Sequence, residues 1–314
     1  MCDISGQKRK STEKEDCVMK KLFALLLTLA MVMSLAACGG GNDAPAKNDT
    51  PANTDAPAGN AAPADTGAEL TTVKDGVLTV ATSPDFAPYE FYAVNESGTP
   101  ELAGFDMALA QYIADYLGLE LEVIPMDFDG TIMELQQKNV DLGMAGYSPD
   151  PKRADAMDFS DIYISGGQSF VCLQSNKDKF TSLEDANKPE YQIGAQVGSI
   201  QADLAKEHTP DADIIELAKV PDILAELLTG KMDGAFIETM VAESYAANYP
   251  ELCVVLEVPY DAVGSVVGVS KGNAALLAGV NEAIAAALED GSFDQYVVTA
   301  IEQASGDIIE GLVE

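Results

Sequence analysis

The chain of 314 residues is long enough for one large or two ordinary domains, and its 47% hydrophobic content is typical of a globular protein with a core. Its formal net charge of −33 repels phosphate backbones and anionic lipid headgroups, which excludes nucleic-acid binding. Because His208 is the one histidine, catalysis or metal binding that needs several histidines is excluded as well.

The first 38 residues have the pattern of an export signal. Two lysines follow Met19, an apolar run extends over 22–35, and small residues precede Cys38. The run is shorter than the roughly 20 residues of a membrane span. Small residues directly before a cysteine resemble the bacterial lipobox, in which the chain is cleaved before the cysteine and its sulfur carries a diacylglycerol. We expect translation to start at Met19 and a lipid anchor at Cys38; the alternative is an ordinary signal peptide with a chance cysteine.

Residues 39–69 are rich in Pro, Ala, Asn and Asp and contain almost no large apolar side chain. Such a tract buries too little surface to offset its ordering entropy, so it is predicted to be a flexible tether. A lipid-anchored tether before a folded body predicts a protein held at the extracytoplasmic face of the cell membrane, with the anchor as its membrane contact.

Strand and helix patterns alternate from residue 77 onward. A buried strand is predicted at 77–81, then a helix whose apolar stripe ends at Gly118. A strand at 119–126, a short helix at 130–138 and a strand at 140–146 follow. This alternation predicts an α/β fold built on mainly parallel sheets. The helical stripe consists of Leu109, Tyr112, Ile113, Tyr116 and Leu117.

Two segments that lie 92 residues apart share one hydrophobic pattern. Either they belong to two similar lobes, or the pattern is that of any helix, turn and strand. If the repeat is real, Gly146 and Glu238 follow corresponding strands and face a site between the lobes, because ligands bind outside the carboxyl ends of such strands. The matching residues are Ile132, Leu135, Val140, Asp141, Gly143 and Met144, with Leu224, Leu227, Met232, Asp233, Ala235 and Phe236.

Arg153 is the only arginine after the leader. It is flanked by Asp150, Asp155 and Asp158, so one interpretation is an ion pair on a solvated loop, which is worth little. However, lysine supplies the other positive charges, and the loop follows the strand that ends near Gly146. The planar fork of arginine is also the side chain best suited to a ligand carboxylate.

Two further stretches could contact a charged ligand. Gly198 and Ser199 precede a helix from about Ile200, whose N–H groups suit an anion, although an ordinary N-cap explains them equally well. Glu238 could accept from an ammonium or simply cap the next helix.

Aromatic residues on loops, Phe86 and Phe128 among them, could sandwich a ligand or pack in the core. The acids at 127–130 resemble the start of a calcium loop, but Lys138 stands where the twelfth-position Glu belongs, so we predict neither a metal site nor a cofactor. Cys172 and Cys253 lie in apolar, strand-like runs and could form a disulfide or stay free buried thiols.

Taken together, six motifs resemble, in order, the polar amino-acid solute-binding proteins of bacterial ABC importers. The resemblance spans about 73–304 and implies a two-lobed, type II periplasmic-binding-protein fold with two hinge strands. One lobe would hold 70–165 and 260–314, the other 166–259. The motifs are "TSPDFAPYEF", "GFDMALAQYIADYLG", "FDGTIMELQQKNVDLGMAG", "SPDPKRADAMDFSDIY", "IGAQVGSIQADL" and "KMDGAFIETMVAESY".

The resemblance implies a monomer that closes around a free, polar amino acid and docks on a membrane permease, without making or breaking a bond. It assigns the ligand carboxylate to Arg153, Ser148, Ser199 and Ile200, and the ammonium to Glu238 and Gly146. It assigns stacking to Phe86 and Phe128, and the side-chain pocket to Ser83, Asp85, Tyr147, Gln168, Gln196 and Gln201.

Three positions depart from the family pattern. Ala108 replaces a second acid after "GFD", Ile200 replaces a frequent Thr, and Glu238 replaces the usual Asp, which lengthens the ammonium-binding side chain by one methylene. Other interpretations are a cyclohexadienyl-dehydratase-like enzyme, a sensor lobe, and a sugar or oligopeptide binder. The enzyme would need a general acid or base in the cleft, and the surroundings of His208 are typical of a surface.

Overall fold

The computed structural model describes residues 70–95, 97–306 and 308–309. All described residues belong to one compact unit of the chain. The expected leader, the tether and Cys38 lie outside the described residues. None of the described helices has the length and apolar character needed to cross a membrane.

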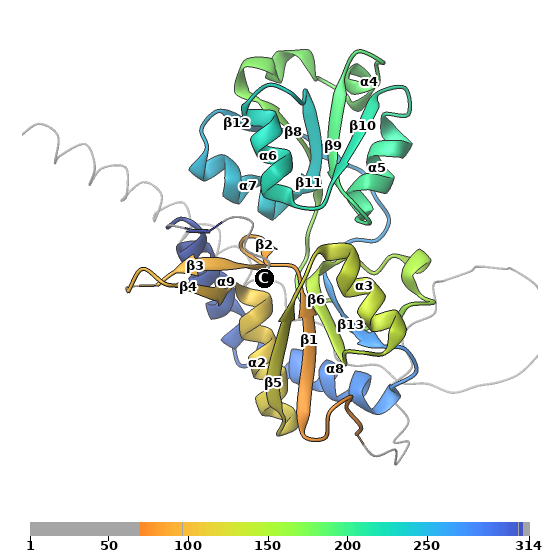
Figure 1. Ribbon diagram of the computed structural model, residues 1–314, viewed down its shortest axis with the longest axis vertical. Coiled ribbons are helices and arrows are strands. Elements are labelled where there is room, and N and C mark those ends of the chain that lie inside the picture. Colours follow the sequence, from red (N-terminus) through yellow and green to blue (C-terminus); the bar gives the residue numbers. More distant parts are fainter. Residues whose placement is uncertain (1–69, 96, 307, 310–314) are drawn as a thin grey trace, which may run out of the picture. The chain divides into compact units, whose positions relative to one another are not determined.

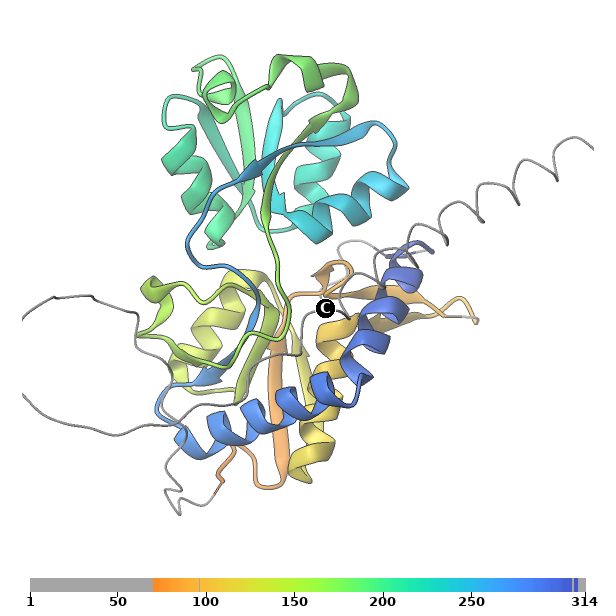
Figure 2. The ribbon, with the colours of Figure 1, turned by 180° about the vertical axis from the view of Figure 1, so that it is seen from behind.

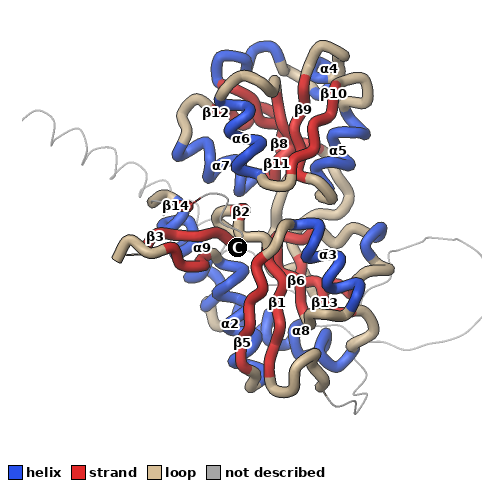
Figure 3. The backbone as a smooth tube through the Cα atoms, in the orientation of Figure 1, coloured by secondary structure: helices blue, strands red, loops and turns tan. Residues whose placement is uncertain are grey.

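Two five-stranded sheets carry the fold (Figures 1 and 3). In each, four strands share one direction and a single strand, β13 or β8, is reversed, which confirms the expected two-lobed α/β class with mainly parallel sheets. Sheet I has the order β5 (Glu120–Pro125), β1 (Val77–Thr82), β6 (Leu142–Tyr147), β13 (Val266–Ser270), β7 (Met157–Phe159). Sheet II has the order β10 (Asp213–Leu217), β9 (Gln192–Gln196), β11 (Gly234–Glu238), β8 (Gln168–Leu173), β12 (Leu252–Val258).

Helices cover both faces of each sheet because strand side chains alternate between faces. Leu78 and Val80 of β1 pack with the α2 side, whereas Ala81 packs with the α3 side. In sheet II, α6 and α7 lie on one face and α5 on the other. The helices are α2 (Phe105–Leu117), α3 (Phe128–Gln137), α4 (Leu183–Ala186), α5 (Ile200–His208), α6 (Val220–Leu228), α7 (Thr239–Asn248), α8 (Ala274–Glu289) and α9 (Ser292–Ala304).

Helix α2 has the predicted stripe, with Leu109 and Ile113 fully buried. Gly118 ends the helix in the left-handed conformation, as expected for a C-cap glycine. Gly104, before the helix, has a φ of 114°, and a Cβ there would lie 2.1 Å from the carbonyl oxygen of Tyr89. Glycine is therefore required where α2 begins.

The two segments with a shared pattern form corresponding units, α3 to β6 and α6 to β11. Before β6, Asp141 donates its N–H to Thr79 O (3.1 Å) and accepts from Thr79 N at Oδ2 (2.9 Å). Before β11, Asp233 does the same with Gln192, at 2.9 and 3.0 Å. Each aspartate thus fixes the start of a strand against its parallel neighbour, which supports the repeat.

Two segments, 160–167 and 259–265, run between the sheets (Figure 2), and Ile164 pairs with Ser265 along them. The lobe boundaries given by the resemblance stay a prediction. A small sheet beside α2 contains β2 (Asp85–Phe86), β3 (Glu90–Val94), β4 (Pro100–Ala103) and β14 (Ile308–Ile309).

Cys172 and Cys253 are paired residues of antiparallel β8 and β12, and both thiols are free. Burial raises the pKa of Cys172 to about 12. Its thiol therefore stays protonated at neutral pH and is poorly reactive, which agrees with the free-thiol alternative.

Candidate functional site

Arg153 ends the short helix η1 (Pro151–Arg153), just past β6. Its guanidinium carbon lies 5.4 Å from the ring centre of Phe128 and 5.8 Å from that of Tyr147. Nη2 donates to the carbonyl of Gly198, in the lobe of sheet II, at 3.2 Å. None of the ion pairs formed by the described residues includes Arg153. Burial lowers the pKa of this guanidinium, and the nearby Tyr147, Asp150 and Asp203 offset that effect only in part.

The neighbouring aspartates have other partners. Asp150 caps η1 by accepting from Lys152 N at 2.9 Å, while Lys152 Nζ pairs with Asp203 at 2.7 Å. Asp158 pairs with Lys271 at 2.6 Å. These acids therefore hold the loop and leave the arginine fork available for a ligand.

Glu238 ends β11 and is the N-cap of α7, and it is 3% exposed. Oε2 accepts from Val241 N at 2.9 Å, so the capping alternative is correct for this oxygen. Oε1 is buried and makes no hydrogen bond of normal geometry to the described residues. Burial raises the pKa of Glu238 to about 7, although N–H groups including that of Gly167 and the Tyr89 hydroxyl lie near enough to lower it.

Gly146 lies on the other side of the predicted ammonium site. Its φ is 58°, and a Cβ there would lie 2.8 Å from the Phe86 ring, so glycine is needed for conformation and for space. Phe86 is buried and packs over Gly146, and Gly146 N donates to Asp106 Oδ2 at 3.2 Å.

At the start of α5, Ser199 is the N-cap. Its Oγ accepts from Ala202 N at 3.2 Å and donates to Gln196 O at 2.6 Å, and its own N–H donates to the same carbonyl. The N–H of Ile200, in the first helical turn, is one of the groups that a helix leaves unpaired. Ser148 is buried, and its carbonyl accepts from Asp150 N at 2.8 Å.

A cavity of about 400 Å³ opens beside these groups. Arg153 lines it together with Ser199 and Ile200, so three of the four residues predicted for the ligand carboxylate share one space. The guanidinium and the helix N-terminus can both stabilise negative charge there, but Glu238 and Gly146 do not line this cavity. Four acids do line it: Asp129, Asp150, Asp203 and Glu216.

Three predicted pocket residues point toward protein partners. Gln201 Nε2 donates to Gln168 Oε1 at 2.7 Å. Tyr147 is fully buried, and its hydroxyl bonds to Thr131 and lies toward Gly143 in the core. The ring of Tyr147, rather than its hydroxyl, therefore belongs to the surroundings of Arg153.

Asp85, 5% exposed, connects the two lobes. Ser83 Oγ donates to Oδ1 at 2.8 Å, while Gln196 Nε2 and Val220 N donate to Oδ2 at 3.0 and 2.9 Å. Burial raises the pKa of Asp85 to about 6 against these bonds. Three predicted pocket residues thus form one network at the carboxyl ends of β1 and β9.

Two buried acids near Gly146 were not predicted as site residues. Glu90 is 1% exposed and Asp106 is fully buried. Both stand in motifs used for the family resemblance, "PYEF" and "GFD". In each motif the acid lies among apolar residues, and this pattern could have indicated that the acid is buried.

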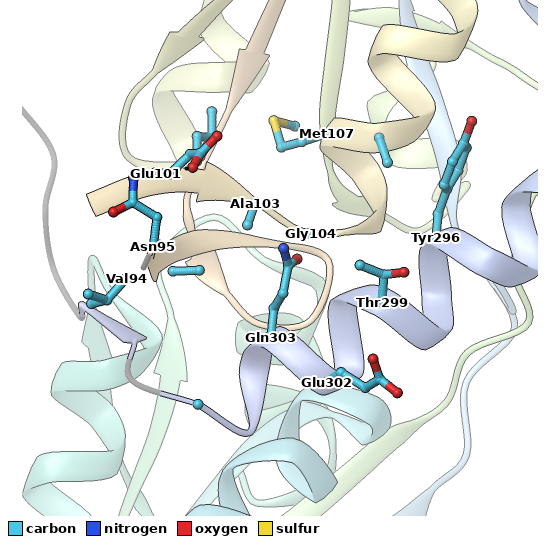
Figure 4. A pocket seen from close by; sticks show the side chains of 14 residues that line it. Val94, Asn95, Glu101, Ala103, Gly104, Met107, Tyr296, Thr299, Glu302 and Gln303 are labelled. Carbon is cyan, nitrogen blue, oxygen red and sulfur yellow. Dashed lines mark hydrogen bonds between the residues drawn. The ribbon is translucent and has the colours of Figure 1, made fainter. Parts of the chain in front are cut away.

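A larger cavity of about 530 Å³ lies between β3, β4, α2 and α9, and Figure 4 shows side chains such as Gln303 and Thr299 along it. None of the predicted site residues lines it. Ala108, which stands where the family has a second acid, does. Within the part of the chain that the structure describes, no group of three or more His, Cys, Asp or Glu side chains could hold a metal ion.

Comparison with known proteins gives a family and relatives. The family of bacterial extracellular solute-binding proteins, family 3, matches residues 78–300. The arginine-binding extracellular protein ArtP of Bacillus subtilis is 31% identical over 237 residues, which are 74% of this chain and 79% of ArtP. A Pseudomonas aeruginosa cyclohexadienyl dehydratase is 28% identical over 58% of this chain and 67% of its own length.

Among solved structures, an amino acid ABC transporter substrate-binding protein from Streptococcus pneumoniae, bound to L-arginine, has a TM-score of 0.69 to this chain at 31% identity. The match covers 76% of this chain and 96% of the pneumococcal one.

Proposed function

Because the chain belongs to the bacterial extracellular solute-binding proteins of family 3, we propose that it captures an amino acid between its two lobes and delivers it to an ABC importer permease. A lipid anchor at Cys38 would keep it at the extracytoplasmic face of the cell membrane. The proposed ligand is a free amino acid of the polar class, and the protein acts as a monomer that changes no covalent bond.

One observation supports this proposal: the two residues proposed for the charged groups of the ligand, Arg153 and Glu238, form no ion pair with the described residues. Glu238 also keeps one buried oxygen without a hydrogen bond of normal geometry. Leaving the buried Glu238 oxygen unpaired is costly, and the half-buried Arg153 has no carboxylate partner among the described residues. An α-amino acid carries a carboxylate and an ammonium on one carbon and can satisfy both.

In the proposed mechanism, the ligand carboxylate binds Arg153 and the N–H groups that begin α5. Its ammonium binds Glu238 Oε1 and the carbonyl of Gly146, while Phe86 and Phe128 border its apolar part. Because these residues come from both lobes, a bound ligand favours the closed arrangement, which the permease then recognises.

Thermal-shift screening against the twenty amino acids is expected to raise the melting temperature with one or a few polar amino acids, since a ligand that binds only the folded state stabilises it. Sugars and oligopeptides serve as controls. If a sugar or peptide stabilises the protein and no amino acid does, the proposed ligand class is wrong. Mass spectrometry of the recovered amino acid should show it unchanged.

A dehydratase-like activity is the alternative, since one relative is such an enzyme. Its general acid could be Glu238, whose pKa of about 7 suits proton transfer. His208 stacks on Phe236 at 6.4 Å at the end of α5 and is assigned no role. A chemically altered compound in the mass-spectrometric test would favour the enzyme.

Replacement of Cys38 by alanine is expected to release the protein from the cell surface into the medium, because the proposed anchor is the diacylglycerol on this sulfur. Fractionation of cells and medium, followed by immunoblotting, measures the change. Cys253→Ala, in sheet II, is the matched control and should stay with the cells. Continued membrane retention of Cys38→Ala would argue against lipidation.

A further inference from the structure

Glu90 and Asp106 are two buried acids in the lobe of sheet I, and their side chains interact with each other. Glu90 begins β3, and Asp106 lies in the first turn of α2, where its N–H donates to Tyr89 O at 2.9 Å. No ion pair of the described residues contains either acid. Two carboxylates in such a place would repel each other without water to screen them, so one of them must hold a proton.

Asp106 is the member of the pair that is equipped to be the anion. Its Oδ1 accepts from the Tyr163 hydroxyl at 2.7 Å, and its Oδ2 accepts from Gly146 N at 3.2 Å. The positive end of α2 also favours negative charge at this position. Burial raises the pKa of Asp106 to about 6 despite these donors, which leaves it ionised at neutral pH.

Glu90 has the opposite surroundings. Counted as a carboxylate, it has two buried oxygens that receive no hydrogen bond from the described residues. A proton on Glu90 reduces this deficit, because it turns one of the two oxygens into a donor to Asp106 and removes the buried charge. Burial, followed by the charges of Asp106 and Asp85, raises the pKa of Glu90 well above its usual value. The titratable groups around it are Asp85, Asp106, Tyr89, Tyr147 and Tyr163.

We propose that Glu90 is a neutral acid that keeps its proton and donates a hydrogen bond to the Asp106 carboxylate, and that Asp106 is thereby the positioning residue for the ligand ammonium. Asp106 accepts from the N–H of Gly146. In the proposed function, on which this positioning role rests, the carbonyl of Gly146 accepts from the ligand ammonium. Through Tyr163, the same carboxylate also holds the segment 160–167 that leads into the lobe of sheet II.

These roles predict opposite responses to two substitutions of equal size. Glu90→Gln supplies a permanent N–H donor to Asp106 and keeps the arrangement. Asp106→Asn removes the charge and leaves one oxygen to accept where Gly146 N and the Tyr163 hydroxyl both donate. A buried donor that loses its acceptor costs the full desolvation penalty.

Infrared spectroscopy of the ligand-free, full-length protein at pH 8 tests the protonation state directly. Asp85, Asp106 and Glu238 are mostly ionised at this pH, given pKa values of about 6, 6 and 7, so Glu90 is expected to give the main band. The wild type should show the carbonyl stretch of a buried, protonated carboxylic acid. The band should be absent from Glu90→Gln and present in Asp115→Asn, a control on the exposed side of α2. Absence of the band from the wild type would overturn the proposal.

Calorimetric titration with L-arginine, the amino acid bound in the pneumococcal relative, tests the positioning role. Asp106→Asn should bind at least about tenfold more weakly, while Glu90→Gln stays within about twofold and Glu90→Ala is weakened. Equal losses in Glu90→Gln and Asp106→Asn, or no loss in Asp106→Asn, would overturn it. If Asp106→Asn does not fold, Tyr163→Phe removes one donor from Asp106 and should weaken binding in its place.

Failure of the proposed function would look different. If no amino acid binds the wild type, the ammonium site is wrong, and the infrared experiment still decides whether Glu90 is neutral.

A third measurement follows from the direction of the pKa shift of Glu90. Because the folded pKa of Glu90 is raised, its contribution to stability is present at low pH and is lost as pH rises through that value. Glu90→Gln should therefore gain stability relative to the wild type as pH increases, and parallel profiles would contradict the protonated state.

Discussion

Arg153→Lys is expected to weaken amino-acid binding by at least about 1.5–3 kcal/mol, measured by isothermal titration calorimetry. Lysine keeps the positive charge but offers a single ammonium in place of a planar fork that donates two parallel hydrogen bonds. It also loses the flat contact with Phe128, over which the guanidinium lies at 5.4 Å. The loss should therefore appear in affinity while the fold stays intact.

The neighbouring residue provides the matched control for this change. Lys152 belongs to an exposed ion pair with Asp203, and such pairs are worth about 0–1 kcal/mol. Lys152→Gln should therefore leave affinity almost unchanged. Equal affinity of Arg153→Lys and the wild type would remove Arg153 from the ligand site.

Glu238→Gln is expected to weaken binding by about 2–5 kcal/mol and to abolish most of its pH dependence, because the ligand ammonium loses its buried counter-charge. In the ligand-free protein, burial holds the pKa of Glu238 at about 7. Binding of an ammonium requires the ionised form, so wild-type affinity should rise as pH increases through about 7. Well below that value, affinity should fall by nearly tenfold per pH unit.

The same shift has the opposite effect on the stability of the empty protein. Because the folded pKa lies above the unfolded value, this group stabilises the ligand-free fold at low pH, and the contribution is lost as pH rises through about 7. Ligand-binding and unfolding measurements between pH 5.5 and 8.5 (roughly 1.5 units on either side of the pKa) distinguish the effect on affinity from the effect on stability. Glu243→Gln, on the exposed side of α7, should keep the wild-type profile. A pH profile unchanged in Glu238→Gln would exclude an ammonium at this carboxylate.

Local patterns predicted the elements well because each depends on nearby residues. The stripe that ends at Gly118 became α2, and Ser199 became the N-cap of α5. The repeat of α3 to β6 in α6 to β11 was also visible in spacing, since helix, turn and strand each impose a fixed period. The prediction that Glu238 and Gly146 face the ligand site was based on their positions at the ends of those two strands.

Side-chain direction and long-range pairing were harder to predict. Tyr147 was expected in the pocket, yet strand alternation places it on the face of Gly143 and Ala145, with its hydroxyl in the core. The bond between Asp85 and Gln196 joins residues 111 apart, and no local pattern contains it. Glu90 and Asp106 were missed because their importance lies in mutual burial, which depends on the packing of β3 against α2.

The positions of the sheet I strands in the sequence affect how the chain folds during its synthesis, which proceeds from the N-terminus. Sheet II takes all its strands from the unbroken stretch 168–258, whereas sheet I needs β13, at 266–270, between β6 and β7. Until β13 is made, the main-chain N–H and C=O groups of two sheet edges have no partner and can pair with other chains. The first half of the sequence is therefore the last to complete its sheet, and a chain truncated before residue 266 should aggregate through these edges.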